Sequence, residues 1–194
     1  MLKRRTLSGA AGILVAIAVA AAARESPRGL YVLNLEGQWV DPLQSADAKA
    51  IVFVFTATDC PISNRYAPEI RRLHDRFRSR GVAFWLVYPD PAESVDAIRR
   101  HIAEYGYPSG ALRDPGHGLV RLSGATVTPE VAVFQAGRRM VYRGRLDDRY
   151  ESFSRVRPVA TEHDLEEVLA ALLAGKPLRR ATTPAIGCFI RDLP

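Results

Sequence analysis

The sequence predicts an α/β fold with a central mixed, mainly parallel sheet and helices on both faces. Two continuously apolar runs, residues 51–55 and 82–88, are rich in β-branched and aromatic residues, as strands covered on both faces should be. The segments after them repeat apolar residues at a spacing of three to four, which indicates amphipathic helices. Strands that alternate with helices along a chain are typical of a parallel sheet between helical layers.

The first elements are a hairpin, a buried strand and a long helix. Residues 31–35 alternate as a half-buried strand does, and residues 36–40 supply a turn and the return arm. The strand over residues 51–55 follows. It leads into a helix over residues 62–80, whose apolar positions keep helical spacing until Gly81 ends it.

The middle of the chain repeats the pattern of strand and helix. The strand over residues 82–88 precedes an amphipathic helix over residues 95–105, which Gly106 closes. Residues 131–134 and 140–142 flank a glycine-containing turn and predict a β-hairpin. This hairpin adds an antiparallel edge to the sheet.

The last predicted element is a helix over residues 165–173, with Thr161 as its N-cap and Gly175 at its end. We therefore expect one domain over residues 24–178. Two segments lie outside its regular plan: a polar insertion over residues 144–158 and a C-terminal tail over residues 179–194.

Residues 1–23 are typical of an export signal. Basic residues precede an uncharged run over residues 9–23, which as a helix would reach only about 22 Å, short of the ~30 Å hydrocarbon core of a membrane. The run ends in alanines that suit signal peptidase. An uncleaved N-terminal anchor is the alternative, and it would be the chain's only membrane contact. Either way we expect the folded part in the periplasm or cell envelope, where disulfides persist.

The net charge of +6 is half due to this signal. Removing its three basic residues leaves 24 Lys and Arg against 21 Asp and Glu, a balance of +3. No segment combines clustered basic residues with interleaved aromatic ones, so the sequence predicts no nucleic-acid partner.

The chain contains only two cysteines, Cys60 and Cys188. Two cysteines exclude a disulfide framework and a four-cysteine metal site. No two histidines have a metal-binding spacing, so we expect no metal ion and no cofactor.

Cys60 lies where a buried strand becomes a helix. Free backbone N–H groups and the helix dipole favour a thiolate there, and Pro61 suits the first helical position, where an N–H has no partner. The negative charge of Asp59 has the opposite effect. The sequence leaves the direction of the net pKa shift of Cys60 open.

Residues 55–70 (FTATDCPISNRYAPEI) resemble the active-site strand and helix of thioredoxin-like proteins, in which a cysteine starts the helix and an Ala-Pro pair follows. Thr128-Pro129 resembles the cis-proline that faces the reactive cysteine in that family. The resemblance extends over roughly residues 29–177. The leading hairpin and the order Asp59-Cys60-Pro61 are most similar to the secreted redoxin branch, which is related to peroxiredoxins and cytochrome-maturation thioredoxins.

Two positions depart from the pattern of these families. Ser63 replaces the second cysteine of Cys-x-x-Cys, so this motif contains no dithiol. Ala57 stands where peroxiredoxins carry a threonine that helps to bind peroxide, although Thr56 and Thr58 flank it.

Cys188 lies in an apolar patch, residues 184–190, within an otherwise polar tail, and we expect this patch to dock on the domain. If it docks near Cys60, Cys188 can resolve an oxidised Cys60. A permanent disulfide is one alternative; closing 128 residues would contribute up to roughly 5 kcal/mol on the chain-entropy model. A small buried apolar side chain is the other.

The resemblance implies an exported oxidoreductase in which Cys60 attacks a protein disulfide or a hydroperoxide. It implies that Ser63 donates a hydrogen bond to the Cys60 sulfur and that Pro61, Thr128 and Pro129 contact the substrate. Cys188, or an external thiol reductant, then completes the cycle. The alternative is a non-catalytic thioredoxin-like module that binds a partner protein, haem or copper and contains a structural Cys60–Cys188 disulfide.

Overall fold

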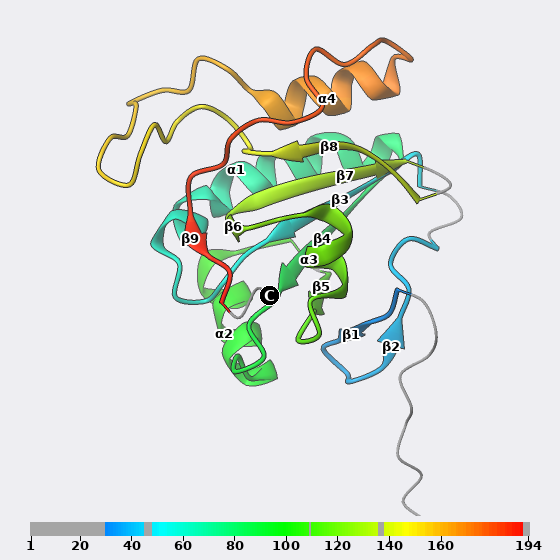
Figure 1. Ribbon diagram of the computed structural model, residues 1–194, viewed down its shortest axis with the longest axis vertical. Helices are drawn as coiled ribbons and strands as arrows, with labels where there is room; N and C mark the ends of the chain where they lie inside the picture. Colours follow the sequence, from blue (N-terminus) through cyan, green and yellow to red (C-terminus); the bar gives the residue numbers. More distant parts are fainter. Residues whose placement is uncertain (1–29, 45–47, 109, 136–137, 192–194) are drawn as a thin grey trace, which may run out of the picture.

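A computed structural model describes residues 30–44, 48–108, 110–135 and 138–191 of the chain (Figure 1). The predicted export signal, residues 1–23, lies outside the described residues. None of the helices in the described part is both long enough and apolar enough to cross a membrane.

The strands are β1 (Val32–Asn34), β2 (Trp39–Val40), β3 (Ala50–Phe55), β4 (Val82–Tyr88), β5 (Ala111–Arg113), β6 (Val127–Thr128), β7 (Glu130–Gln135), β8 (Arg139–Gly144) and β9 (Cys188–Phe189). The helices are α1 (Pro61–Phe77), the short 3-10 helix η1 (Arg78–Arg80), α2 (Val95–Tyr105), α3 (Gly118–Ser123) and α4 (Asp164–Leu173). Every strand and helix predicted from the sequence is present, within a few residues of its expected ends.

Within the described residues, seven strands form one mixed sheet in the order β2-β1-β5-β4-β3-β7-β8. The central strands β3, β4 and β5 are parallel, and the flanking strands are antiparallel. This α/β arrangement is the thioredoxin-like fold. Because β3 and β4 are parallel neighbours, their carboxyl ends open at the same edge of the sheet, where the loop before Cys60 lies.

Strand β3 divides the core in two, because successive side chains of a strand point to opposite faces. Val52 and Val54 pack with residues of α1, α2 and α4 on one face. Phe53 and Phe55 pack on the other face, with residues of α3 and of the N-terminal hairpin. Each face is therefore covered, which explains why the sequence of β3 is continuously apolar.

Short elements escaped the sequence analysis, because β5, α3, β6 and β9 have two to six residues each and too little periodicity. The predicted N-cap of the last helix was also wrong. Helix α4 begins after His163, and Thr161 instead donates its backbone N–H and its hydroxyl to Asp148, at 2.6 and 2.5 Å.

The C-terminal tail docks along the domain, as the apolar patch predicted. It first runs beside β8, where the N–H of Arg143 donates to Ala181 and the N–H of Thr183 donates to Arg143. Its short strand β9 then pairs with β6 (Figure 1). Ile190 closes the contact: its side chain is buried in the core and its N–H donates to Thr126.

Candidate active site

Cys60 is the N-cap residue of α1, at the carboxyl end of β3. Its backbone is extended, with φ −86° and ψ 107°, and its carbonyl accepts the first helical hydrogen bond, from Asn64. Pro61 is the first helical residue, as predicted, and is exposed. The Cys60 side chain is 0% exposed, so its sulfur lies beneath other parts of the chain.

Thr128 and Pro129 lie opposite Cys60, and the bond between them is cis. The register of the sheet brings them there: β7 runs antiparallel to β3, with Glu130 paired to Phe55, so the residues before β7 meet the loop after β3. The Cys60 S–H donates to the Thr128 carbonyl, with sulfur and oxygen 2.9 Å apart. The Glu130 carboxylate supports this segment by accepting the N–H of Thr126 at 2.8 Å.

Cys188 lies beside Cys60, because β9 pairs antiparallel with β6 and sets Cys188 opposite Thr128. The two thiols are close enough for each to shift the pKa of the other. Gly187 permits the close approach: a Cβ atom at this position would lie 2.2 Å from the Thr128 carbonyl oxygen. Both cysteines are free thiols in this structure.

The two thiols differ in acidity. Burial opposes ionisation of Cys60, but the polar side chains of Cys188, Ser63 and Thr128 beside the sulfur outweigh it, so the pKa of Cys60 is lowered from its usual value. For Cys188, burial and the hydrogen bond that it donates to Cys60 both favour the thiol and raise its pKa to about 12. Cys60 is therefore the thiol that ionises first.

Ser63 lies one helical turn after Cys60, with its side chain completely buried. Its hydroxyl has no hydrogen-bond partner of regular geometry among the described residues, and its proximity to the Cys60 sulfur lowers the pKa of that thiol. The Ser63 carbonyl accepts a hydrogen bond from the Tyr107 hydroxyl at 2.7 Å. The backbone around the serine is thereby tied to the segment after α2.

A buried carboxyl group supports the loop that precedes Cys60. Glu93 accepts the N–H of Thr58 through Oε1 at 2.6 Å, and its Oε2 has no partner among the described residues. Burial is the main reason that the pKa of Glu93 is raised. This glutamate was not among the site residues predicted from sequence. Its place in the loop after β4 was a usable signal, because that loop must lie beside the loop after β3.

A chain of polar side chains continues from this loop into the core. Asn64 connects the Thr58 carbonyl to His101, whose Nε2 lies 2.7 Å from the Asn64 Oδ1. The other ring nitrogen of His101 lies 2.9 Å from the Tyr88 hydroxyl. These partners suit a neutral ring that donates from Nε2 and accepts at Nδ1, and burial lowers the pKa of His101 accordingly. His101 was not among the site residues predicted from sequence.

Arg191 forms ion pairs with two acidic residues beside the site, Asp59 and Asp90. Its guanidinium lies 3.0 Å from the Asp59 carboxylate and 3.3 Å from that of Asp90. The first pair is exposed on both sides and so is energetically weak. It nevertheless sets a positive charge from the tail beside the acidic residue that precedes Cys60.

Two other features lie away from the thiols. Glu69, Asp147 and His163 bring potential metal-ligating atoms within 4.8 Å of one another, but Arg72 occupies both oxygens of Glu69, and Tyr66 and a backbone N–H both donate to Oδ1 of Asp147. Much of the hydrogen-bonding capacity of these carboxylates is thus used within the protein.

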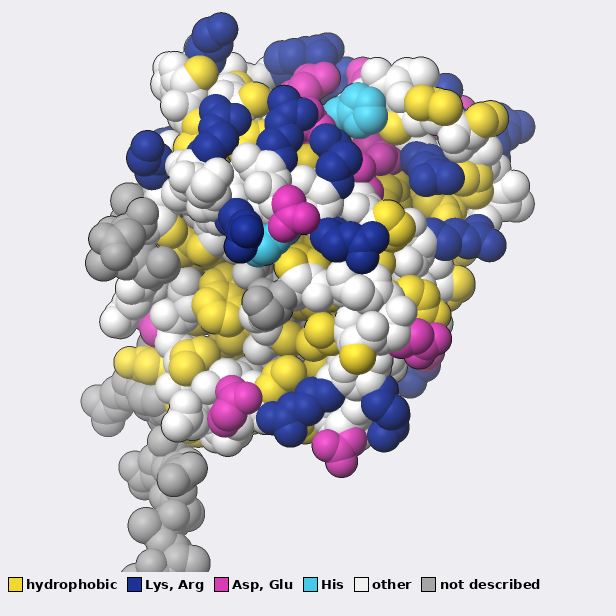
Figure 2. All heavy atoms as spheres, turned by 180° about the vertical axis from the view of Figure 1, so that it is seen from behind, with side chains coloured by type: hydrophobic (Ala, Val, Ile, Leu, Met, Phe, Trp, Pro, Cys, Tyr) yellow, Lys and Arg dark blue, Asp and Glu magenta, His cyan; other side chains and the backbone are white. Residues whose placement is uncertain are grey.

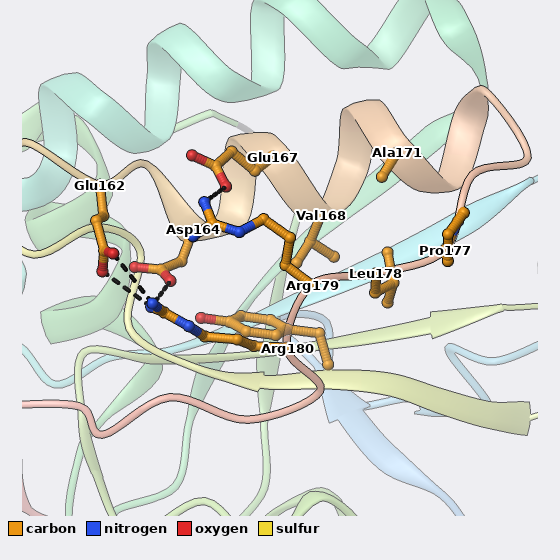
Figure 3. A pocket seen from close by; sticks show the side chains of 10 residues that line it. Glu162, Asp164, Glu167, Val168, Ala171, Pro177, Leu178, Arg179 and Arg180 are labelled. Atoms are coloured by element: carbon orange, nitrogen blue, oxygen red, sulfur yellow. Dashed lines mark hydrogen bonds and ion pairs between the residues drawn. The ribbon is translucent and has the colours of Figure 1, made fainter.

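A pocket lies between α4 and residues 177–180 (Figure 3). Arg180 points to Glu162 and Asp164 across it, and Arg179 points to Glu167. Its free volume of about 90 Å³ corresponds to only a few water molecules. On the face shown in Figure 2, basic and acidic side chains are interspersed rather than gathered into one patch.

The fold and the paired thiols together define a thioredoxin-like redoxin. The chain belongs to the AhpC/TSA family, whose model matches residues 25–143, more than half of the chain. No curated protein matches the chain by sequence.

Solved structures agree on the fold. An uncharacterised conserved protein from Geobacillus kaustophilus is 28% identical, with a TM-score of 0.73, over 85% of this chain and 89% of that one. A hypothetical protein from Sinorhizobium meliloti is 24% identical, with a TM-score of 0.68, over 83% and 89%. A secreted disulfide oxidoreductase from Mycobacterium tuberculosis is 17% identical, with a TM-score of 0.52, over 73% and 94%.

Proposed function

We propose that the protein is an exported thiol-dependent oxidoreductase in which Cys60 and Cys188 form a reversible dithiol–disulfide pair. One observation carries the proposal: β9 sets Cys188 opposite Thr128, whose carbonyl accepts the Cys60 S–H at the N-terminus of α1, beside the cis bond of Pro129. Ser63 excludes a disulfide within the helix motif, and Cys188 supplies the missing second thiol from the tail.

Cys60 is the thiol that reacts with the oxidant. Its lowered pKa increases the thiolate fraction, and the N-terminus of α1 stabilises the negative charge. Ser63 is a positioning residue that lowers the pKa of the sulfur through its hydroxyl. Pro61 is the exposed residue next to the sulfur, whereas Thr128 and Pro129 are buried beneath β9. A substrate therefore contacts Thr128 and Pro129 only when β9 moves.

Two classes of oxidant fit this chemistry. Attack of Cys60 on a protein disulfide gives a mixed disulfide and releases one thiolate of the substrate. Attack of Cys60 on a hydroperoxide gives a sulfenic acid and releases an alcohol or water. In either case Cys188 then attacks the Cys60 sulfur, which forms the internal disulfide and releases the substrate's second thiol, or water.

The peroxide reaction is the second candidate function, and the AhpC/TSA family match favours it. The complete burial of Cys60 also favours a small oxidant over a bulky one. Ala57 counts against it, because a threonine hydroxyl helps to bind peroxide at this position in peroxiredoxins.

Export supports a disulfide cycle, because disulfides persist outside the reducing cytoplasm. The proposal of a signal or anchor over residues 1–23 depends on its basic start and its apolar run. We place the folded part in the periplasm or cell envelope.

The test compares Cys60→Ser with the unmodified protein, using a protein disulfide and a hydroperoxide as separate substrates. We expect Cys60→Ser to lose at least roughly 10³-fold in turnover of the true substrate, since removal of a nucleophile elsewhere costs up to about 10⁶-fold. Unchanged turnover of both substrates, or no turnover by the unmodified protein, would favour the non-catalytic module that binds a partner protein, haem or copper. Metal and haem analysis of the purified protein then tests whether copper or haem is bound.

A further inference from the structure

Three potential metal ligands that the thiol chemistry does not use meet where three segments of the chain come together. Glu69 lies on α1, Asp147 in the insertion after β8, and His163 immediately before α4. One ligand atom of each side chain lies within 4.8 Å of the other two. The three residues come from distant parts of the sequence and include a single histidine, which is why the histidine spacing did not predict this cluster.

The hydrogen bonds within the cluster leave room for a cation. A carboxylate has about four lone-pair positions. Arg72 uses one on each oxygen of Glu69, and it also pairs with Glu166, so it keeps a partner if Glu69 turns toward an ion. Two hydrogen bonds reach Oδ1 of Asp147, and none reaches its Oδ2 from the described residues.

The same hydrogen bonds orient the carboxylates as ligands. In metal sites, ligating carboxylates are themselves hydrogen-bonded to outer partners that fix their direction. Tyr66 lies one helical turn before Glu69 on α1 and donates its hydroxyl to Asp147. The helix therefore supplies one carboxylate and orients the other.

Asp147 is a buried carboxyl group without a positively charged hydrogen-bond donor. It is only 6% exposed, and its two donors, the Tyr66 hydroxyl and a backbone N–H, are neutral. Burial is the main reason that the pKa of Asp147 is raised; its hydrogen bonds lower it, and the charge of Glu69 raises it. Since buried charges are normally paired or coordinate a metal, a divalent cation between the two carboxylates would offset both the burial and the repulsion.

The donor atoms and their spacing favour zinc. Imidazole nitrogen and carboxylate oxygen both bind Zn²⁺, whereas Mg²⁺ and Ca²⁺ prefer oxygen alone. Three atoms within 4.8 Å of one another share a point about 2.8 Å or less from each. Zinc takes these ligands at about 2.0–2.2 Å, so movements of less than about 1 Å complete the site. The partly exposed Glu69 and the exposed His163 are free to make them.

We propose that Glu69, Asp147 and His163 form a zinc-binding site, with water as the fourth ligand. Three protein ligands and one water give the tetrahedral coordination that zinc adopts in open sites. The site is separate from Cys60 and Cys188, and the inference goes beyond the proposed redox function without depending on it. Bound zinc fastens the insertion, residues 144–158, to α1 and to the start of α4.

The first experiment measures zinc binding. The full chain carries Cys60→Ser and Cys188→Ser, because thiolates bind zinc themselves. It is freed of metal with a chelator and titrated with zinc chloride by calorimetry. We expect one zinc ion per chain, and a rise in Tm of at least about 5 °C when free zinc is a hundredfold above Kd. Absence of saturable binding, or equal affinity for Mg²⁺, overturns the proposal.

The second experiment removes single ligands in the same background. We expect His163→Ala and Glu69→Gln each to weaken zinc binding at least about tenfold, since loss of even an outer partner of a metal ligand costs that much. His163 is exposed and its φ of −113° suits alanine, so this variant keeps the fold. Urea unfolding without zinc checks this for both variants.

His74→Ala is the matched control, because the His74 ring lies on α1 at 3.1 Å from the single carboxylate of Asp75. We expect it to bind zinc as the background protein does. Undiminished affinity in both His163→Ala and Glu69→Gln, or an equal loss in His74→Ala, overturns the proposed ligands.

The third experiment tests whether zinc fastens the insertion. Arg155 and Arg157 offer trypsin cleavage sites within it, and their side chains are 78% and 40% exposed. Because cleavage requires local opening of the chain, we expect zinc to slow it severalfold in the background protein and in His74→Ala, but not in His163→Ala. Cleavage at the same rate with and without saturating zinc contradicts the fastening of the insertion.

Discussion

The segments that carry the two cysteines are built in different ways. The segment around Cys60 is specified locally: a buried strand ends, an N-cap and a proline begin a helix, and the sulfur lies at the helix N-terminus. The segment around Cys188 has only two residues in a strand, and its position depends on contacts far away in sequence, with β8 and with β6. The reactive thiol is thus fixed by its own element, whereas its partner is held by the packing of a tail.

This difference suggests a division of labour. A reaction centre on a helix terminus keeps its geometry whether or not the tail is in place, and a thiol on a docked strand can move when a partner binds. Two glycines make the docking close. A Cβ atom at Gly187 would meet Thr128, and a Cβ atom at Gly144 would lie 2.2 Å from the Thr183 hydroxyl.

The largest effect is expected from removing the partner thiol. Cys188→Ser leaves the helix, Cys60 and the cis bond in place, but an oxidised Cys60 has no thiol to resolve it. We expect steady-state turnover to fall roughly a hundredfold or more, with Cys60 accumulating as a mixed disulfide or a sulfenic acid. Mass analysis during turnover provides the readout. A variant that cycles at the normal rate would show that the two segments are functionally independent.

A smaller effect is expected from loosening the tail while keeping both thiols. Gly187→Ala forces a methyl group against the Thr128 carbonyl, so β9 must shift. We expect a loss of about 1–3 kcal/mol in the free energy of unfolding, as for other overpacked sites, and slower formation of the Cys60–Cys188 disulfide. Urea unfolding and quenched oxidation measure the two quantities.

Gly116→Ala is the control for this substitution, because a Cβ atom there has no neighbour within 4 Å and the backbone φ of Gly116 is not positive. If Gly187→Ala forms the disulfide as fast as the Gly116→Ala control, the close approach of β9 does not position Cys188.

A change in the pKa of Cys60 tests the link between the Cys60 segment and the Cys188 segment without unfolding the protein. Cys188→Ala removes a side chain that favours the Cys60 thiolate, so we expect the pKa of Cys60 to rise. Cys188→Ser retains an O–H donor and should raise it less. The pH dependence of Cys60 alkylation measures the pKa. An unchanged alkylation profile in Cys188→Ala would mean that Cys188 has no influence on Cys60.

The same shifts give opposite trends in stability. Because the folded pKa of Cys60 is lowered, its stabilising contribution is present above its unfolded pKa and is lost as the pH falls through the folded value. The pKa of Cys188 is raised to about 12, so its contribution is present below its unfolded value of 9.0 and is lost as the pH rises toward 12.

The smallest effect is expected in the insertion, residues 144–158, which lines a pocket together with residues of the tail. Asp148 accepts hydrogen bonds from Thr161 and Glu162. Burial opposes its ionisation, but these bonds outweigh it and lower its pKa to about 2. Its contribution is therefore complete above pH 3.8, its ordinary value, and is lost as the pH falls toward 2.

We expect Asp148→Asn to lower the free energy of unfolding at neutral pH by about 1 kcal/mol and to flatten this acid dependence. The rate of Cys60–Cys188 disulfide formation should not change. Acid titration of stability by circular dichroism is the measurement, and a slower disulfide would mean that the insertion also positions the tail.

Features of the site that depend on residues close together in sequence were predictable from the sequence, and features that depend on distant contacts were not. The start of α1 at Cys60 and the Thr128-Pro129 landmark were predictable because residues a few positions apart determine them. Predicting Glu93 as a site residue requires one further rule, namely that the loops after two neighbouring parallel strands lie side by side. The pairing of Cys188 with Thr128 could not be predicted from the sequence. The docking of the apolar patch was predictable, but the residues that it meets depend on Gly187 and on backbone contacts between the tail and β8.

The redox equilibrium of the Cys60–Cys188 pair tests the central claim most directly. The full chain is equilibrated in glutathione buffers of graded ratio, quenched with acid, alkylated and mapped by peptide mass. We predict a single two-electron transition in which the Cys60 and Cys188 peptides are linked when oxidised and separately alkylated when reduced, at a potential above roughly −300 mV, the value below which structural disulfides resist glutathione. A bond that stays closed in every buffer, or thiols that oxidise independently, would contradict the claim.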